Sequence, residues 1–480
     1  MTAKNINFIA LKSETQRAIA NYLIDVGGKG YDVQEFDRHL KYGGTKLSLA
    51  KQDGYYGKLN LATLKKLGYA VIEILHENGE NKALNCFQSY RELFANQSQD
   101  RHCDSISYIQ KIQILPPDLF TNIDPADLIS PNGLRIPEHL NTAEEIQNYS
   151  AQLLVPKLLL AAICAIHNQF PWMDLDMDLN STMHTMRPDP DKHHVNAGYG
   201  GGSIKQHTDG YWNEQRNVPL IIVFLSISNP NREPTGFIPV EAIFRIPSLN
   251  SPIYSDWLSV FQDLIPDGQT PEEFVKWVVE QATKPQFSFV MGVLGGDAKR
   301  AVYETPLLEK DPRYGRYLFR AKSTFGCSNP QAQSVVAFTN RMIEFLGDRQ
   351  MSDSYIEVSL SPGEVYLALN GAGLSIHTNP EYEEDGYAYP VKGAATIHGR
   401  GTLSAIQGKI DRTLARGNSL LAPERTFYSP DDGAELLLEE LQKDYPPSSF
   451  LSLDRNSFFP ERGVVSELLN AGIRGNELKR

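Results

Sequence analysis

A histidine and an aspartate two residues apart, His207 and Asp209, stand in the stretch KQHTDGYWN, shortly before a strongly apolar segment. Successive side chains of a β-strand point to opposite faces, so on a strand these two residues share one face. An imidazole nitrogen and a carboxylate oxygen on one face can both bind a transition-metal ion. A second pair of this kind, His102 and Asp104, lies in a polar stretch without a strand pattern, and we interpret it as a chance occurrence.

A third metal ligand has to come from a distant strand, and two downstream histidines are candidates. His377 and His398 each follow a short segment of small or apolar residues, so expected burial does not separate them. Arg412 follows His398 by 14 residues (412 − 398 = 14), whereas the first arginine after His377 is Arg400, beyond an acidic loop. We therefore favour His398 as the third ligand and keep His377 as the alternative.

Two histidines and one carboxylate form the ligand set of non-haem Fe(II) oxygenases, which leaves positions open on the metal. Zinc accepts the same donors in hydrolytic sites and is the competing metal. Arg412 favours iron, because a keto-acid co-substrate that chelates iron at one end needs a cation for its far carboxylate. The guanidinium is a permanently charged, bidentate partner for such a group. A zinc hydrolase gives this arginine no role, and a non-catalytic, cupin-like binding protein is a further alternative.

The composition is that of a globular protein, with 480 residues of which 41% are hydrophobic and 22% charged. A net charge of −12 argues against nonspecific binding to nucleic acid or anionic lipid. The four cysteines form no CxxC pair, which favours reduced thiols over disulfides. The N-terminus lacks the apolar core of a signal peptide, and no window approaches a membrane span. We expect a cytoplasmic protein with a small-molecule substrate and no nucleic-acid or membrane partner; the oligomeric state stays open.

The first third of the chain mixes helical and strand patterns. The spacing of apolar residues predicts a helix over 13–26. Residues 60–75 predict a short helix, a break at Gly68 and then the strand YAVIEIL. The long apolar run within 143–169 predicts a buried helix that is interrupted at Pro156.

From about residue 180 the pattern changes to short strands separated by Gly, Pro and Asn. The segment VPLIIVFLSIS is almost wholly apolar and β-branched, as expected of a strand that is buried on both faces. The predicted strands are 218–228, 286–294, 355–360 and 364–370, the predicted helical stretches are 254–283 and 331–348, and 379–393 is predicted to be a loop-like insertion or lid. These patterns indicate an α+β protein with a mainly β core, arranged as an antiparallel sandwich or barrel.

Several motifs, taken in chain order, resemble those of the taurine dioxygenase and clavaminate synthase-like Fe(II)/2-oxoglutarate oxygenases, over roughly residues 60 to 425. HTD resembles the proximal His-x-acid pair, and IHGR and DRTLAR resemble the segments that carry the distal histidine and the 2-oxoglutarate arginine. GYAVIEIL (68–75) resembles an early strand, and LSPGEVYLALN (360–370) the strand before the distal histidine. Thr235 follows His207 by 28 residues (235 − 207 = 28), where the family has a threonine that contacts 2-oxoglutarate.

The resemblance implies a double-stranded β-helix (a cupin-like jelly roll) with flanking helices. It divides the chain into an N-terminal helical extension over 1–59, an oxygenase domain over 60–425 and a C-terminal helical extension over 426–480. Relative to the family, the oxygenase domain carries insertions at about 250–310 and 371–396. The second insertion separates the LSPGEVYLALN strand from the distal histidine, where the family usually has only a few residues.

The resemblance also implies the chemistry. His207, Asp209 and His398 would bind Fe(II), and Arg412 and Thr235 would bind 2-oxoglutarate. With O₂, such a site hydroxylates an unactivated C–H bond and releases succinate and CO₂; desaturation and cyclisation remain alternatives. An acidic residue at position 209 favours hydroxylation, because related halogenases have Gly or Ala there. We expect an amino-acid-like substrate, and the candidate substrate residues are Ser203, Gln206, Trp212 and Arg320.

Overall fold

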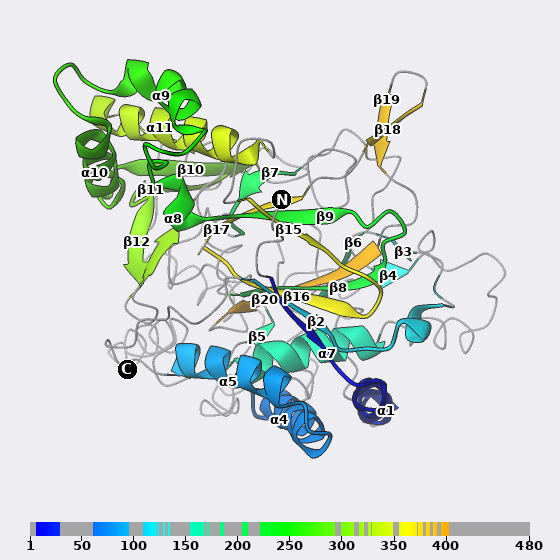
Figure 1. Ribbon diagram of the computed structural model, residues 1–480. Helices are drawn as coiled ribbons and strands as arrows, with labels where there is room; N and C mark the ends of the chain where they lie inside the picture. Colours follow the sequence, from blue (N-terminus) through cyan, green and yellow to red (C-terminus); the bar gives the residue numbers. More distant parts are fainter. Residues whose placement is uncertain are drawn as a thin grey trace, which may run out of the picture.

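A computed structural model of the chain gives the architecture (Figure 1). The structure describes residues 6–28, 61–95, 109–121, 123, 128–129, 133–134, 154–167, 170–171, 183–186, 204–209, 221–292, 299–311, 316–320, 325–327, 329–348, 355–371, 373–377, 381–384, 387–390 and 395–402. Helices and a mixed β-sheet together make it an α+β fold. No helix in these ranges is long and apolar enough to cross a bilayer.

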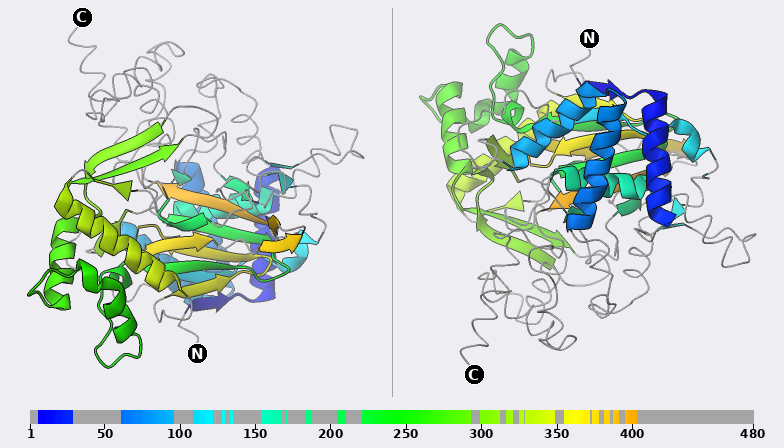
Figure 2. Two further views of the ribbon diagram at one scale, coloured as in Figure 1. Left: turned by 90° about the horizontal axis from the view of Figure 1, so that it is seen from above. Right: turned by 90° about the horizontal axis from the view of Figure 1, so that it is seen from below.

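A layer of helices covers one face of the largest sheet (Figure 2). Its helices are α1 (Ser13–Gly28), α4 (Leu61–Glu77), α5 (Asn81–Ala95) and α7 (Leu154–Ile166). Their apolar residues recur at helical spacing; on α4, for example, Leu67, Val71 and Leu75 are all buried. The predicted helix over 13–26 is confirmed as α1. The predicted buried helix is confirmed over α7, where Pro156 lies in the first turn and does not interrupt the helix.

The predicted break at Gly68 and the strand after it are wrong, because α4 runs through them as one helix. A Cβ on Gly68 would lie 2.9 Å from Cγ1 of Ile166 and 3.0 Å from the carbonyl oxygen of Ala162, both on α7. Gly68 therefore allows α4 and α7 to pack closely. This close packing is the reason that a glycine is found inside α4. Most apolar residues of the apparent strand YAVIEIL lie on the buried side of the same helix, whereas its Tyr69 is exposed. The proposed resemblance of 68–75 to an early family strand fails with it.

Two sheets form the β core. The larger has the order β1-β2-β16-β8-β20-β5, with β6 beside β20, and only the β1–β2 pair is parallel. Its strands are β1 (Asn7–Ala10), β2 (Ile109–Gln113), β5 (Phe170–Pro171), β6 (Met183–Met186), β8 (Ile221–Ser228), β16 (Glu364–Leu369) and β20 (Ala395–Thr402). The smaller sheet has the order β15-β9-β17-β7, and its strands are β7 (Ile204–His207), β9 (Pro234–Pro239), β15 (Ile356–Ser359) and β17 (Gly373–His377). The strands predicted at 218–228, 355–360 and 364–370 correspond to β8, β15 and β16.

The two sheets pack face to face, with the helices on the outer side of the larger one (Figure 1). Strand β8 shows how the larger sheet is buried on both sides, because its side chains point alternately into two different cores. Val223 and Leu225 belong to the core under the helices. Ile222 and Phe224 belong to a second core, which also contains Phe237 of β9 in the smaller sheet. Strand β8 is thus buried on both faces, as its apolar sequence predicts.

A separate group of helices and strands has its own aromatic core. It comprises α8 (Val240–Ile243), α9 (Tyr254–Phe261), η5 (Gln262–Leu264), α10 (Pro271–Ala282), β10 (Phe287–Gly292), β11 (Lys299–Thr305), β12 (Leu308–Asp311), β13 (Arg316–Phe319), β14 (Phe325–Gly326) and α11 (Pro330–Gly347). Trp257, Phe261, Phe274 and Phe338 are fully buried in it. The helical stretches predicted over 254–283 and 331–348 and the strand predicted at 286–294 all fall in this group, which lies beside the smaller sheet (Figure 1).

Five short elements of the described residues remain: η1 (Pro117–Phe120), the pair β3 (Leu128–Ile129) and β4 (Gly133–Leu134), and a hairpin of β18 (Glu381–Glu384) and β19 (Tyr387–Pro390). The hairpin occupies the segment predicted to be a loop, so that prediction is wrong for these residues. Tyr382 pairs with Tyr389 across the hairpin, and the alternation of tyrosine with other residues is the strand signal that the acidic composition of the segment obscured. The hairpin projects away from both sheets (Figure 1).

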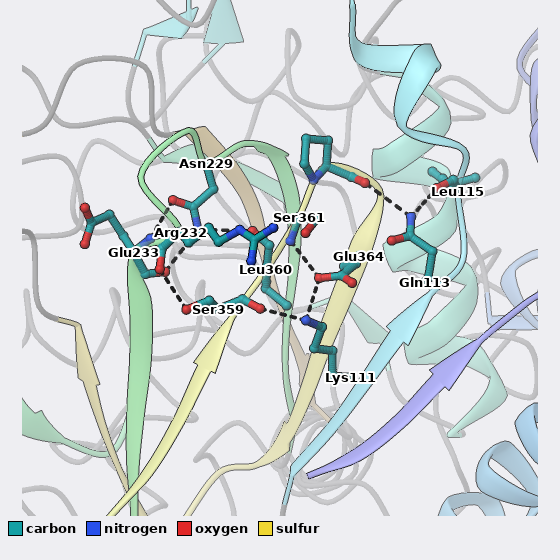
Figure 3. Close-up of polar contacts among 11 residues, drawn as sticks. Lys111, Gln113, Leu115, Asn229, Arg232, Glu233, Ser359, Leu360, Ser361 and Glu364 are labelled. Atoms are coloured by element: carbon teal, nitrogen blue, oxygen red, sulfur yellow. Dashed lines mark hydrogen bonds and ion pairs between the residues drawn. The ribbon is translucent and has the colours of Figure 1, made fainter. Parts of the chain in front are cut away.

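Polar side chains hold the two sheets together at the end where β15 passes into β16 (Figure 3). Lys111 Nζ lies 2.8 Å from Oε2 of Glu364, which also accepts a 2.6 Å hydrogen bond from the N–H of Ser361. Asn229 accepts a hydrogen bond from the N–H of Glu233 at 2.8 Å and donates to the carbonyl of Leu360 at 3.0 Å. These bonds fix the β8–β9 turn and the β15–β16 turn against each other.

His167, at the end of α7, makes the stability of this core sensitive to acid. Burial lowers its pKa from the ordinary 6.5 to about 3. The unfolded chain therefore takes up a proton below about pH 6.5 that the folded protein does not, so the free energy of unfolding falls as pH drops towards 3. We expect a loss of at most about 1.4 kcal/mol per pH unit from this group.

Replacing His167 with phenylalanine is expected to remove that part of the acid sensitivity. The measurement is the free energy of urea unfolding between pH 4 and 7.5 for both proteins. Equal slopes of stability against pH in the two proteins would show that His167 does not contribute.

Candidate metal centre

His207 and Asp209 reach the centre of the molecule at the end of a short strand of the smaller sheet. Strand β7 ends at His207, which pairs across the ladder with Ser375 of β17. Asp209 follows two residues later and is buried, with 7% of its surface exposed. The Nε2 atom of His207 lies 3.2 Å from Oδ1 of Asp209. The two side chains are thus in contact, although Asp209 lies beyond the end of β7 and not on the strand that the spacing argument assumed.

His398 approaches the same carboxylate from the larger sheet. It lies in the middle of β20, opposite Phe224 of β8 and His184 of β6. Its neighbour Ile397 belongs to the core under the helices, so alternation along the strand turns His398 towards the smaller sheet. His398 is 4% exposed, and its ring centroid lies 4.2 Å from that of Phe224. Its Nε2 atom is 3.7 Å from Oδ2 of Asp209.

The carboxylate of Asp209 thus lies between two imidazoles, one from each sheet. Two ligands at right angles, each about 2.1 Å from a metal ion, lie about 3.0 Å apart. The His207 contact is close to that spacing, and the His398 contact is longer. Within the described ranges, no group of three or more His, Cys, Asp or Glu side chains has the closed spacing of an assembled metal site. The donor set itself, two imidazoles and one carboxylate in a buried position, fits a divalent transition metal.

Two hydroxyl groups also face the space between the sheets. Thr235 is two residues before Phe237 on β9, and Ser226 is two residues after Phe224 on β8, so alternation turns both towards the core that the sheets share. Ser226 is fully buried, and its Oγ has no hydrogen-bond partner among the described residues. Because β8 and β9 are joined by a short turn, both hydroxyls lie towards that end of the sandwich. The only sequence signal for Ser226 is a polar residue within an apolar strand.

The other predicted residues divide into those that the structure describes and those that it does not. Arg412, Ser203 and Trp212 lie outside the described residues, as does the side chain of His377, whose backbone ends β17 opposite Thr235. The Nε2 atom of Gln206 would lie 2.6 Å from a Cβ on Gly347, so Gln206 contacts the end of α11. Gln206 is therefore not brought together with His207 and Asp209.

Arg320 is 6% exposed and follows β13 directly. Its N–H donates a 2.9 Å hydrogen bond to the carbonyl of Leu307, and the N–H of the preceding Phe319 donates one of 2.7 Å to the carbonyl of Gly371. Gly371 follows Asn370, whose side chain contacts the backbone of Asp209. Arg320 is thus linked through the backbone to the neighbourhood of Asp209. Asn370 was not identified from the sequence.

The described cysteines offer no thiolate to this site. Cys86, Cys164 and Cys327 are free thiols, as expected from their spacing, and Cys103 lies outside the described residues. Burial raises the pKa of Cys86 and of Cys164 to about 12, so both stay protonated at neutral pH. Among the residues that the structure describes, the donors near Asp209 are therefore nitrogen and oxygen.

No family model matches the sequence, and no curated protein matches it. Solved structures with a similar course of the chain include an asparagine oxygenase in complex with Fe(II), 2S,3S-3-hydroxyasparagine and succinate. It is 11% identical, with a TM-score of 0.46 over 85% of this chain and 96% of that one. Another is the non-haem iron oxygenase OrfP in complex with Fe and alpha-ketoglutaric acid, 13% identical, with a TM-score of 0.45 over 85% of this chain and 96% of that one.

Proposed function

We propose that the protein is a non-haem Fe(II)/2-oxoglutarate-dependent oxygenase that hydroxylates an unactivated C–H bond of a small amino-acid-like substrate. The observation that carries this proposal is the convergence of His207, Asp209 and His398 between two facing sheets. The donors match the two-histidine, one-carboxylate set of such enzymes. The order of the motifs along the chain, with Arg412 fourteen residues after His398 (412 − 398 = 14), supports the same class.

The strand order supports a double-stranded β-helix as the fold of the oxygenase core. One half of it is β15-β9-β17-β7, and the facing half is β6-β20-β8-β16 within the larger sheet. In this description the aromatic group over α8 to α11 is inserted between β9 and β15. The β18–β19 hairpin is inserted between β17 and β20.

In this function each side chain has a defined task. His207, Asp209 and His398 would hold the iron, and Fe(II) with 2-oxoglutarate and O₂ would supply the oxidising power that the side chains lack. Arg412 would bind the far carboxylate of 2-oxoglutarate through a bidentate pair. Thr235 and the buried hydroxyl of Ser226 would donate hydrogen bonds to the co-substrate deeper between the sheets, and the apolar core around Phe224 would exclude water.

The substrate would enter from the side of the centre where Asp209 lies. Arg320 is the described residue with the best claim to contact an amino-acid carboxylate, because it is buried and linked to the Asp209 neighbourhood. Ser203 and Trp212 remain candidates from their places on either side of His207 in the sequence. Gln206 is a weaker candidate, because its amide contacts the end of α11.

The decisive experiment is anaerobic addition of Fe(II) and 2-oxoglutarate, which is expected to give a weak visible charge-transfer band. Arg412→Ala is expected to weaken 2-oxoglutarate binding about 100-fold, because the loss of two hydrogen bonds to a charged group costs on the order of 3 kcal/mol. Affinity is measured by titrating the band. Lys409→Ala is the matched control in the same segment and should bind 2-oxoglutarate like the parent protein.

Binding of 2-oxobutyrate, a keto acid without a far carboxylate, should change little in Arg412→Ala. A folded, metal-loaded protein that shows no band would rule out the proposed function. A zinc hydrolase would give no band and would act without O₂. A non-catalytic cupin-like protein would tolerate Arg412→Ala and release no succinate with any substrate.

A further inference from the structure

We infer that Asn370 is a positioning residue that sets the place of the Asp209 carboxylate and thereby the affinity of the metal site. The inference rests on the proposed function only in taking Asp209 as a metal ligand. The side chain of Asn370 makes two hydrogen bonds to the backbone of Asp209. Its Oδ1 accepts from the N–H of Asp209 at 3.0 Å, and its Nδ2 donates to the carbonyl of Asp209 at 2.9 Å.

A carboxamide has one acceptor and one donor side by side, as a peptide unit has. Strand β7 ends at His207, so Asp209 lies beyond the last residue that the ladder of the smaller sheet holds. Asn370, which directly follows β16 of the larger sheet, supplies the missing partner. Asn370 and Asp209 are 4% and 7% exposed, so water does not replace these bonds readily. The backbone of one metal ligand is thus held by the opposite sheet.

The position of Asn370 is itself fixed. It follows β16 directly, and the next residue, Gly371, has a positive φ of 82° that a side chain would strain. The carbonyl of Gly371 accepts a 2.7 Å hydrogen bond from the N–H of Phe319, which is buried in the aromatic core of the α8–α11 group. The backbone at Asn370 is therefore tied to the aromatic core of the α8–α11 group, and its side chain in turn holds the backbone of Asp209.

A metal ion binds more tightly to ligands that the fold already holds in place, because binding then does not have to order those side chains. Groups that orient metal ligands typically change metal affinity by about 10- to 100-fold when they are removed. Without the Asn370 side chain, Asp209 would still carry its carboxylate. Its backbone would lose the two hydrogen bonds that fix its position, so the carboxylate would no longer be held in one place. The loss should appear in metal affinity more than in the overall stability.

The test compares Asn370→Ala with Asn229→Ala. Asn229 is a matched control, because its side chain also accepts from a backbone N–H and donates to backbone carbonyls, with bonds of 2.8 to 3.0 Å. It lies near the other end of β16 (Figure 3), about 20 Å away at roughly 3.4 Å per residue. The probe is Co(II) without co-substrate, titrated by its visible absorption, and the melting temperature of each apoprotein is measured beside it.

Asn370→Ala is expected to weaken Co(II) binding 10- to 100-fold and to alter the Co(II) spectrum, whereas Asn229→Ala loses stability but binds Co(II) like the parent. If Asn370→Ala does not fold, the isosteric Asn370→Asp, which keeps the acceptor but not the donor, is expected to show the same direction of change. Unchanged affinity in Asn370→Ala, or an equal loss in Asn229→Ala, would overturn the inference. If the parent protein binds Co(II) but gives no band with Fe(II) and 2-oxoglutarate, the proposed function is wrong, and the comparison of Asn370→Ala with Asn229→Ala still decides the inference. If the parent protein binds no metal, both the proposed function and the inference are wrong.

Discussion

Replacing His398 with alanine is expected to abolish the Fe(II)/2-oxoglutarate charge-transfer band and to lower succinate formation by at least about 1,000-fold. The physical reason is the position of His398, which brings the second imidazole to the Asp209 carboxylate from the opposite sheet. A ligand set reduced to one histidine and one carboxylate holds a divalent ion too weakly to keep the co-substrate ordered on it. The readouts are the anaerobic band and succinate released under O₂.

His377→Ala is the matched comparison, since both histidines lie on strands in the same part of the sequence, His377 at the end of β17 and His398 within β20. His377 lies at the end of β17, opposite Thr235 and two residues beyond Ser375, which pairs with His207. We expect this variant to keep the band, and His207→Ala to lose it. A band that disappears in His377→Ala and persists in His398→Ala would move the third ligand to the smaller sheet.

The sequence predicts best those helices and strands in which each face has the same degree of burial along the whole length of the element. Strand β8 is almost wholly apolar because both of its faces are buried, and α1 shows helical spacing because only one of its faces is buried. The segment around Gly68 misleads for a physical reason. A glycine inside a helix looks like a break unless one knows that α7 passes within 3 Å of the Cβ position. That information lies about a hundred residues away, in Ala162 and Ile166.

The residues of the candidate site also differ in how well they can be predicted from the sequence. The pair His207 and Asp209 can be suggested because both residues lie on one short segment, but Asp209 lies beyond the end of β7, where strand alternation no longer sets its direction. His398 can be suggested only through its relation to Arg412, since no local pattern says which strand faces which. Asn370 and Ser226 have no local signal beyond polarity next to apolar residues. Their roles arise from the contact between the two sheets, which is a property of the folded chain.

The second large effect concerns stability, because Glu364→Ala is expected to lower the free energy of unfolding by about 3 kcal/mol. Glu364 is 6% exposed at its side chain and Lys111 21%, and the two lie 2.8 Å apart. Lys111 also donates to the carbonyl of Ser359 at 2.9 Å, so it cannot leave for solvent without breaking the join between β2 and β15 (Figure 3). Removal of Glu364 leaves the partly buried cation of Lys111 without its carboxylate. Loss of one partner of a fully buried pair typically costs about 3–5 kcal/mol, and the partial exposure of Lys111 places the expected loss at the lower end of that range. Urea unfolding at neutral pH measures the change.

An ion pair on the surface provides the control. Arg17 and Asp118 also form an ion pair, but their side chains are 56% and 54% exposed, so Asp118→Ala should cost less than about 1 kcal/mol. The double variant Lys111→Met, Glu364→Leu removes both charges, and we expect it to regain most of the stability lost in Glu364→Ala, because an apolar pair leaves no uncompensated charge. If Glu364→Ala lowers the free energy of unfolding no more than Asp118→Ala does, the Lys111–Glu364 ion pair does not stabilise the end of the sandwich where β15 passes into β16. Recovery in the double variant, in contrast, would assign the loss to the stranded charge of Lys111 and not to the missing bond to Ser361.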